Sequence, residues 1–148
     1  MPATEKVYSI GEVSKITGLP SSTIRYYDRL EFLPYLQKSA RGIRQFTQRD
    51  LDTIRVIECL KKTGLTLKEI QDYTRLIAQG DDSIVERQQL FHSIRQRLLN
   101  KMAEMQRNLQ ILDFKCAYYD QAVKEGTEKN VLESMSLMTV LSKIDNEN

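Results

Sequence analysis

The sequence predicts a mainly α-helical protein in which a winged helix-turn-helix domain and a further helix pair precede one long coiled-coil helix. Three observations predict this fold. Short amphipathic segments in residues 1–80 begin at hydrogen-bonding caps and end at glycines. A basic segment containing Pro34 and Gly42 interrupts them. No proline or glycine occurs from residue 81 to residue 125, where apolar residues recur with heptad spacing.

Length and composition limit the kind of protein. A chain of 148 residues with 41% hydrophobic and 28% charged residues fits one or two small folded units. It has no apolar run long enough to cross a bilayer and no signal-peptide core at the N-terminus, so we expect a cytoplasmic protein without a membrane partner. The two cysteines, Cys59 and Cys116, are too few for a disulfide scaffold or a four-cysteine zinc site. We expect no metal, no cofactor and no catalytic residue.

The net charge of +2 is unevenly placed. Residues 1–80 carry 13 Lys and Arg against 9 Asp and Glu, whereas residues 81–148 carry 9 against 11. Within residues 22–49 there are 6 basic and 2 acidic side chains. A local basic excess on a nearly neutral chain favours a polyanion partner, although a merely solvated surface has the same composition.

The first two helices form the helix-turn-helix pattern. Ser9 and Glu12 make a capping box that opens a helix over residues 9–17, and Gly18 ends it. A second short helix follows over residues 21–30 after a tight turn.

The second helix has one face for the core and one for a ligand. Ile24 and Tyr27 lie three residues apart and face the core. The opposite face, called the recognition face below, combines hydroxyl, phenol and guanidinium groups, which suit phosphate oxygens and guanine edges. Its members are Ser22, Arg25, Tyr26 and Arg29. This pattern predicts docking in the major groove of duplex DNA.

Residues 31–46 predict a small basic hairpin. Pro34 blocks a helix and Gly42 permits a tight reversal. The hairpin carries Lys38, Arg41 and Arg44, so it predicts a DNA-binding wing.

Two more helices complete a domain spanning residues 1–80. The first covers residues 51–63 and stops at Gly64, and the second covers residues 67–79 and stops at Gly80. Each opens at a cap, formed by Thr47 with Asp50 and by Thr66 with Glu69.

A long helix over residues 82–124 predicts dimerisation by the segment 81–124. At 1.5 Å per residue it is roughly 60 Å long, too long to bury its apolar stripe against the first domain. The simplest partner is a second copy, and the alternative is the tail, residues 125–148, folding back. We expect a short helix in this tail and disorder at its end. The stripe, called the seam below, consists of Phe91, Leu98, Met102, Met105, Leu109, Leu112, Cys116, Tyr119 and Val123.

Several segments together resemble the mercury-resistance regulator (MerR) family of bacterial transcription factors. The resemblance covers residues 8–124 and rests on "YSIGEVSKITGLPSSTIRYYDRLEFLP", on "GIRQFTQRDLDTIRVIECLKKTGLTLKEI" and on the long helix. It implies an antiparallel dimer of long helices. Many members have a tyrosine where this chain has Ile43. The resemblance places DNA contacts on Ser22, Arg25, Tyr26, Lys38 and Arg44.

The resemblance also implies a function. A homodimer binds a palindromic site in double-stranded promoter DNA and distorts an overlong spacer, so that RNA polymerase is affected indirectly. Such a protein belongs to the bacterial nucleoid in the cytoplasm. Metal-sensing members carry cysteines after the long helix, but this chain has none after Cys116 and only one histidine, His92. Drug-sensing members have a large C-terminal domain, for which the residues after Lys124 are too few.

Cys59 is the candidate sensor thiol. It lies at the polar border of its helix, with Arg55 at i−4 and Lys62 at i+3. Neighbouring cations favour the reactive thiolate, whereas the nearby helix C-terminus opposes it. The segment "IECLKKTGL" resembles the thiol-sensing, aldehyde-responsive branch of the family. The alternative is a small residue tolerated at a packing border, and Cys116 is expected to act as a small hydrophobe in the seam.

Three other functional classes are alternatives to a transcription regulator. An architectural or recombination-accessory DNA-bending protein also uses winged helix-turn-helix domains. A coiled-coil adaptor would have no DNA role. An enzyme is poorly supported, because the sequence has no Gly-rich phosphate loop, nucleophile elbow or metal-ligand spacing.

Overall fold

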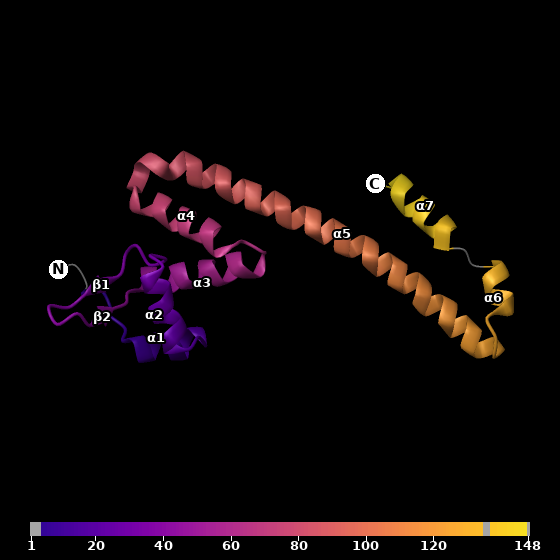
Figure 1. The fold of residues 1–148 in the computed structure, drawn as a ribbon, viewed down its shortest axis with the longest axis horizontal. Helices are drawn as coiled ribbons and strands as arrows, with labels where there is room; N and C mark the ends of the chain where they lie inside the picture. Colours follow the sequence, from indigo (N-terminus) through magenta and orange to yellow (C-terminus); the bar gives the residue numbers. More distant parts are fainter. Residues whose placement is uncertain (1–3, 135–136, 148) are drawn as a thin grey trace. The chain divides into compact units, whose positions relative to one another are not determined.

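The computed structural model describes residues 4–134 and 137–147 (Figure 1). The chain divides into two compact units, of which the first ends at Ile94 and the second begins at Arg95. No helix in the described part of the chain is both long and apolar enough to cross a membrane. The fold is mainly helical, as the sequence predicts.

The predicted helix-turn-helix is present at the start of the first unit. Helix α1 (Ile10–Thr17) begins at a complete capping box between Ser9 and Glu12. It ends at Gly18, whose φ of 74° is left-handed and costs glycine no steric strain. Helix α2 (Ser21–Arg29) follows directly.

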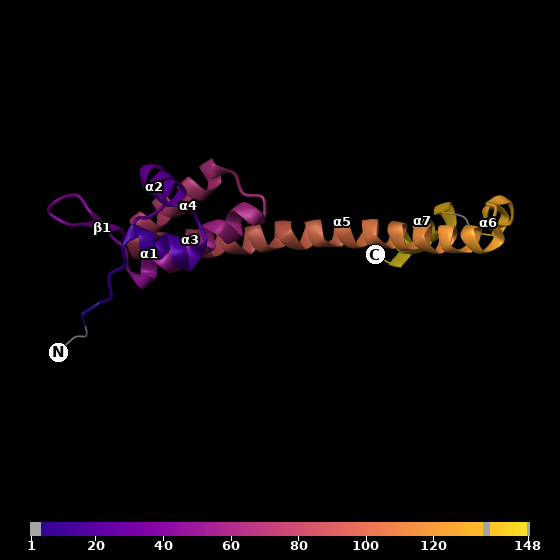
Figure 2. The same ribbon diagram turned by 90° about the horizontal axis from the view of Figure 1, so that it is seen from below.

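The predicted wing is a two-stranded antiparallel hairpin. Strand β1 (Gln37–Lys38) pairs with strand β2 (Arg44–Gln45), and Gly42 turns the chain between them at a φ of 80°. Figure 2 shows the hairpin loop extending away from the helices of this unit. A backbone bridge between Tyr8 and Phe46 joins the base of the wing to the segment before α1.

The second helix pair consists of α3 (Gln48–Lys62) and α4 (Leu67–Ala78). Both predicted capping boxes are confirmed, the first between Thr47 and Asp50 and the second between Thr66 and Glu69. Burial raises the pKa of Asp50, while its hydrogen bonds from Thr47 act in the opposite direction. The α3 cap is therefore a carboxylate held inside the core, with no exposed surface.

One apolar core holds the first unit together. It confirms the predicted inward placement of Ile24 and Tyr27. Ile94 of the long helix belongs to this core, so the first turns of that helix pack as part of the first unit. The buried core residues are Val13, Ile24, Tyr27, Phe32, Leu33, Phe46, Leu51, Ile54, Ile57, Leu60, Leu65, Ile70 and Ile94.

The long helix α5 (Ile84–Glu125) matches the predicted helix closely. It begins two residues later than predicted, because residues 80–83 form a 3₁₀ turn in which the Ser83 hydroxyl donates to the Gly80 carbonyl at 2.9 Å. Gly126 follows its end with a φ of 70°.

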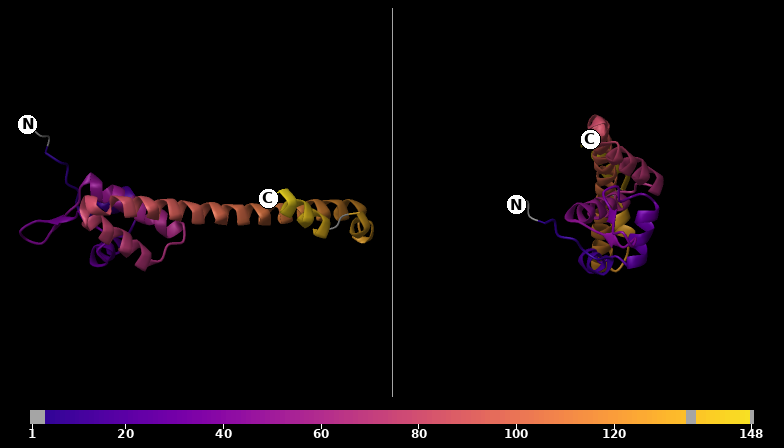
Figure 3. Two further views of the ribbon diagram at one scale, coloured as in Figure 1. Left: turned by 90° about the horizontal axis from the view of Figure 1, so that it is seen from above. Right: turned by 90° about the vertical axis from the view of Figure 1, so that its left-hand side faces the viewer.

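The described part of the tail forms the helices α6 (Lys129–Ser134) and α7 (Leu137–Glu147), so the helix expected in the tail is present. The expected terminal disorder is not found as far as Glu147, because α7 continues to that residue. Figure 3 shows both helices alongside the C-terminal half of α5. Arg107 forms an ion pair with Asp145 at 3.0 Å, and the Tyr118 hydroxyl donates to Glu128 at 3.1 Å.

The tail covers one face of α5 and leaves the seam uncovered. Phe114, Tyr118 and Ala122 are buried on the tail side, whereas Met105 is 68% and Val123 is 80% exposed. At 3.6 residues per turn these two sets lie on roughly opposite sides of the helix. Folding back of the tail was the alternative to a second copy as the partner of the seam. The tail instead covers a different apolar stripe of α5.

Candidate nucleic-acid interface

The recognition face of α2 points into solvent. Its four members, Ser22, Arg25, Tyr26 and Arg29, are all exposed. The Arg29 guanidinium lies 5.9 Å from the centre of the Tyr26 ring, a cation–π arrangement that restrains both side chains. The helix therefore presents a partly ordered set of donors on the side opposite its buried residues.

The structure separates the three predicted wing contacts. Arg41 lies on the exposed turn of the hairpin. Arg44 and Lys38 instead share one carboxylate oxygen of Asp28 on α2, at 2.8 Å from the Arg44 Nε and 3.4 Å from the Lys38 Nζ. The sequence did not predict these two contacts, because Lys38 and Arg44 lie 10 and 16 residues from Asp28 along the chain. The carboxylate ties the wing to the recognition helix and offsets part of its charge.

The buried side of α2 carries a polar contact that sequence reasoning also missed. The Tyr27 hydroxyl donates to a Glu58 carboxylate oxygen of α3 and accepts from the Lys61 Nζ at 2.8 Å. Lys61 and Glu58 are themselves 3.6 Å apart. Burial, and then the bond to Glu58, raise the pKa of Tyr27, and the bond to Tyr27 raises the pKa of Lys61. The phenol thus stays protonated and the ammonium charged at neutral pH. These three side chains are called the phenol network below.

The C-terminal end of α2 is fixed by α4. The Gln71 side-chain amide donates to the Leu30 carbonyl at 3.0 Å. Arg75 pairs with Glu31 at 3.7 Å, and Glu31 adopts a left-handed φ of 63°. The recognition helix therefore packs against α1, is bonded to α3 through Tyr27 and is fixed to α4 at its end.

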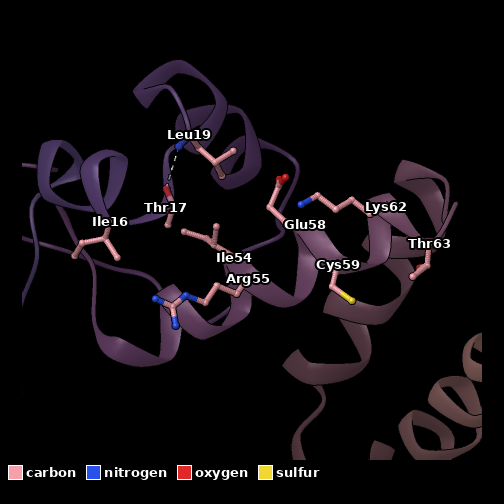
Figure 4. A pocket seen from close by; sticks show the side chains of 9 residues that line it. All are labelled: Ile16, Thr17, Leu19, Ile54, Arg55, Glu58, Cys59, Lys62 and Thr63. Carbon is pink, nitrogen blue, oxygen red and sulfur yellow. Dashed lines mark hydrogen bonds between the residues drawn. The ribbon is translucent and has the colours of Figure 1, made fainter.

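Cys59 opens onto a cleft of about 600 Å³ between the end of α1 and helix α3 (Figure 4). The thiol, which the sequence placed at the polar border of its helix, is exposed. The expected approach of two cations is not seen, because the Arg55 guanidinium and the Lys62 ammonium both point away from the sulfur in Figure 4. The lining residues are Ile16, Thr17, Leu19, Ile54, Arg55, Glu58, Cys59, Lys62 and Thr63.

The remaining predicted residues lie on α5. Cys116 is exposed on the uncovered side with most of the seam. Phe91 differs, because its ring packs edge-on against Tyr73 within the first unit, with ring centres 5.1 Å apart. Among residues 4–134 and 137–147, no cluster of three or more His, Cys, Asp or Glu side chains could hold a metal ion.

A helix-turn-helix with an exposed basic recognition face and a basic wing defines a DNA-binding domain. Residues 8–76 match the family model described as "MerR HTH family regulatory protein". The chain is also 34% identical over 124 residues to an uncharacterized HTH-type transcriptional regulator of Haemophilus influenzae, covering 84% of this chain and 92% of that protein. The chain therefore belongs to the MerR family of DNA-binding transcriptional regulators, which are not enzymes.

Solved structures agree with this family. The fold is similar to HiNmlR, described as a MerR family regulator lacking the sensor domain and bound to promoter DNA, with a TM-score of 0.74, 33% identity and 84% and 99% of the two chains covered. A MerR family regulator from Bacillus thuringiensis gives a TM-score of 0.67 at 32% identity, covering 76% and 98%. The AdhR regulator of Bacillus subtilis is 33% identical over 91 residues, covering 62% of this chain and 65% of that protein.

The contacts of Asp28 with Lys38 and Arg44 predict that the Asp28→Asn substitution affects specific and non-specific DNA binding differently. In Asp28→Asn the wing loses its charged tie to α2 while Lys38 and Arg44 become available to phosphates. We expect the preference for the operator over a random duplex to fall roughly fivefold, as for about 1 kcal/mol of a partly exposed ion pair. Titrations of both duplexes over a salt series measure it. Asp52→Asn removes an equal charge from the exposed side of α3, and an identical effect of the two variants would contradict a positioning role for Asp28.

Proposed function

We propose that this MerR family regulator acts as a homodimer that binds a palindromic promoter site and distorts the spacer between the promoter elements. The observation that carries the proposal is the exposed recognition face of α2, which lies beside a wing tied to the same helix through Asp28. Two such domains contact two half-sites, and their contacts offset the energy of deforming the DNA. RNA polymerase is then affected through the altered promoter, and the site of action is the nucleoid in the bacterial cytoplasm.

The uncovered seam of α5 supports the homodimer. Met102, Met105, Leu109 and Leu112 are between 48% and 68% exposed. Monomeric proteins rarely leave so regular an apolar stripe in water, and a second copy of the same helix matches its heptad spacing. The tail helices contact the other side of α5, so they do not compete for the seam. We propose an antiparallel pairing, which the family resemblance implies.

We further propose that Cys59 responds to electrophiles such as aldehydes. In this reaction the sulfur forms a bond to the carbonyl carbon and the thiol proton passes to the carbonyl oxygen, which gives a hemithioacetal without an oxidant. The support is the access of the thiol to a cleft inside the DNA-binding unit. Similarity of the surrounding segment to the thiol-responsive branch adds to it, whereas a neighbouring cation does not, since Arg55 and Lys62 point away.

Loss of the Arg25 guanidinium tests the DNA-binding function. Footprinting of the wild-type protein on its own upstream region should reveal an inverted repeat within the promoter spacer. For Arg25→Ala we expect operator affinity to fall by about 1–3 kcal/mol, because one base-edge or phosphate contact per half-site is removed. Arg95→Ala removes the same charge from α5 and should leave the footprint intact. Equal operator binding by both variants would overturn the assignment of the recognition face.

Disulfide cross-linking tests the dimer and its orientation. A seam running from residue 91 to residue 123 is centred near residue 107, so antiparallel pairing brings residue 98 opposite residue 116 of the second copy. In a Cys59→Ser background we expect mild oxidation to cross-link the Leu98→Cys variant. The same protein with Leu98 retained should stay uncross-linked. Cross-linking through Cys116 alone would indicate parallel helices, and sedimentation as a single copy at micromolar concentration would remove the dimer.

Promoter transcription in vitro tests the thiol response. With purified RNA polymerase we expect a small aldehyde such as acetaldehyde to change transcription from the operator promoter for the wild type and for Cys116→Ser. Cys59→Ser should bind the operator normally but give no response, because the sulfur that forms the adduct is gone. A normal response from Cys59→Ser would exclude this thiol as the sensor while leaving the DNA-binding function untouched.

A further inference from the structure

The phenol of Tyr27 is the one polar end on the buried face of α2, and it lies between two charged groups of α3. The ring is 1% exposed and packs against Phe32, with ring centres 5.6 Å apart. Its hydroxyl reaches Glu58 and Lys61. A phenylalanine would fill the same apolar space, so the hydroxyl serves the contact between α2 and α3 rather than the packing.

Tyr27 is placed where a small rotation of α2 alters both parts of the DNA-binding surface. Its chain neighbours are Tyr26 on the recognition face and Asp28, which holds the wing. Successive residues lie about 100° apart around a helix, so any turn of α2 about its axis moves these two side chains together. The hydrogen bonds of the phenol network therefore restrain the rotation of α2 about its axis relative to α3.

The other end of the network reaches the cleft at Cys59. Glu58 lines that cleft and is the residue immediately before Cys59 (Figure 4). The cleft also has an apolar side, formed by Ile16, Leu19 and Ile54, where a small organic group fits. Both residues line the same cleft, so a group that is attached to the thiol and fills the cleft can contact Glu58, although the Glu58 carboxylate points away from the sulfur itself in Figure 4. Displacing Glu58 removes that acceptor from the phenol.

We propose that the Tyr27–Glu58–Lys61 network sets the orientation of the recognition helix and transmits to it the occupancy of the cleft at Cys59. The transmission part rests on the proposed thiol response, whereas the orientation part does not. Glu58 and Lys61 are positioning residues, since they act on DNA only through α2.

The orientation is tested by the preference for operator over random duplex. Tyr27→Phe keeps the ring and removes the hydroxyl, and we expect the preference to fall about fivefold or more, as for a charge-assisted hydrogen bond. Tyr118→Phe is the matched control, because it removes a buried hydroxyl bonded to a glutamate in the second unit. Glu58→Gln retains an acceptor and should retain most of the preference, whereas Glu58→Ala should lose it. Thermal unfolding confirms that each variant is folded under the binding conditions.

The transmission is tested by labelling. In a Cys116→Ser background, N-ethylmaleimide modifies Cys59 alone: the sulfur bonds to one alkene carbon, the alkene electron pair takes a proton from water at the other, and the thiol proton goes to solvent. We expect labelling to change the operator Kd about fivefold or more in this parent and less than twofold when Tyr27→Phe is added, because the route to α2 is then interrupted.

The outcomes are distinguishable. An unchanged operator preference in Tyr27→Phe overturns the orientation part. An equal effect of labelling with and without the hydroxyl, or no effect in the parent, overturns the transmission part. Absence of any footprint from the unlabelled parent would instead overturn the proposed function itself.

Discussion

The anchoring of α2 is the constraint on which the DNA-binding surface depends. A helix of nine residues has too few turns to be stable by itself, so its orientation is set by what its buried face contacts. Ile24 and Tyr27 supply that face, and both are essentially removed from water. The recognition face is a consequence of this burial, because Ser22, Arg25, Tyr26 and Arg29 on the opposite side of the helix are left exposed.

The long helix α5 carries two apolar stripes on different sides. Phe114, Tyr118 and Ala122 are covered by the chain's own tail, and the seam on the opposite side stays open. Apolar burial is worth about 25 cal/mol per Å², so each stripe gains from a partner of its own. Because the two stripes lie on different sides of α5, the tail folds back without covering the surface that the proposed dimer uses.

Much of this arrangement was predictable from the sequence, and the parts that were not share a physical cause. The capping boxes at Ser9 and Thr66, the stop at Gly18 and the inward face of α2 depend on residues three or four apart, so local spacing revealed them. The partners of Asp28 and of Tyr27 lie 10 to 34 residues away along the chain and meet only after folding. The direction in which side chains point could not be predicted from the sequence either. Arg55 and Lys62 are helix neighbours of Cys59 by spacing, yet their charged ends turn elsewhere.

The magnitudes involved favour a regulator that works through small shifts in helix orientation. Bending a site of 20–30 base pairs costs on the order of 1–6 kcal/mol, and in the proposed mechanism both half-sites hold their contacts while the spacer is deformed. A charge-assisted hydrogen bond is worth about 1.5–3 kcal/mol, and the proposed dimer contains each such bond twice. Loss of the Tyr27 contacts in both copies is thus comparable with the whole deformation energy. The contact of Asp28 with Lys38, in which the lysine side chain is 51% exposed, is worth only about 0.2–1 kcal/mol and adjusts the wing. In the proposed dimer, the Tyr27 contacts with α3 are therefore a more effective point than the Asp28–Lys38 contact for the proposed chemistry at Cys59 to act on.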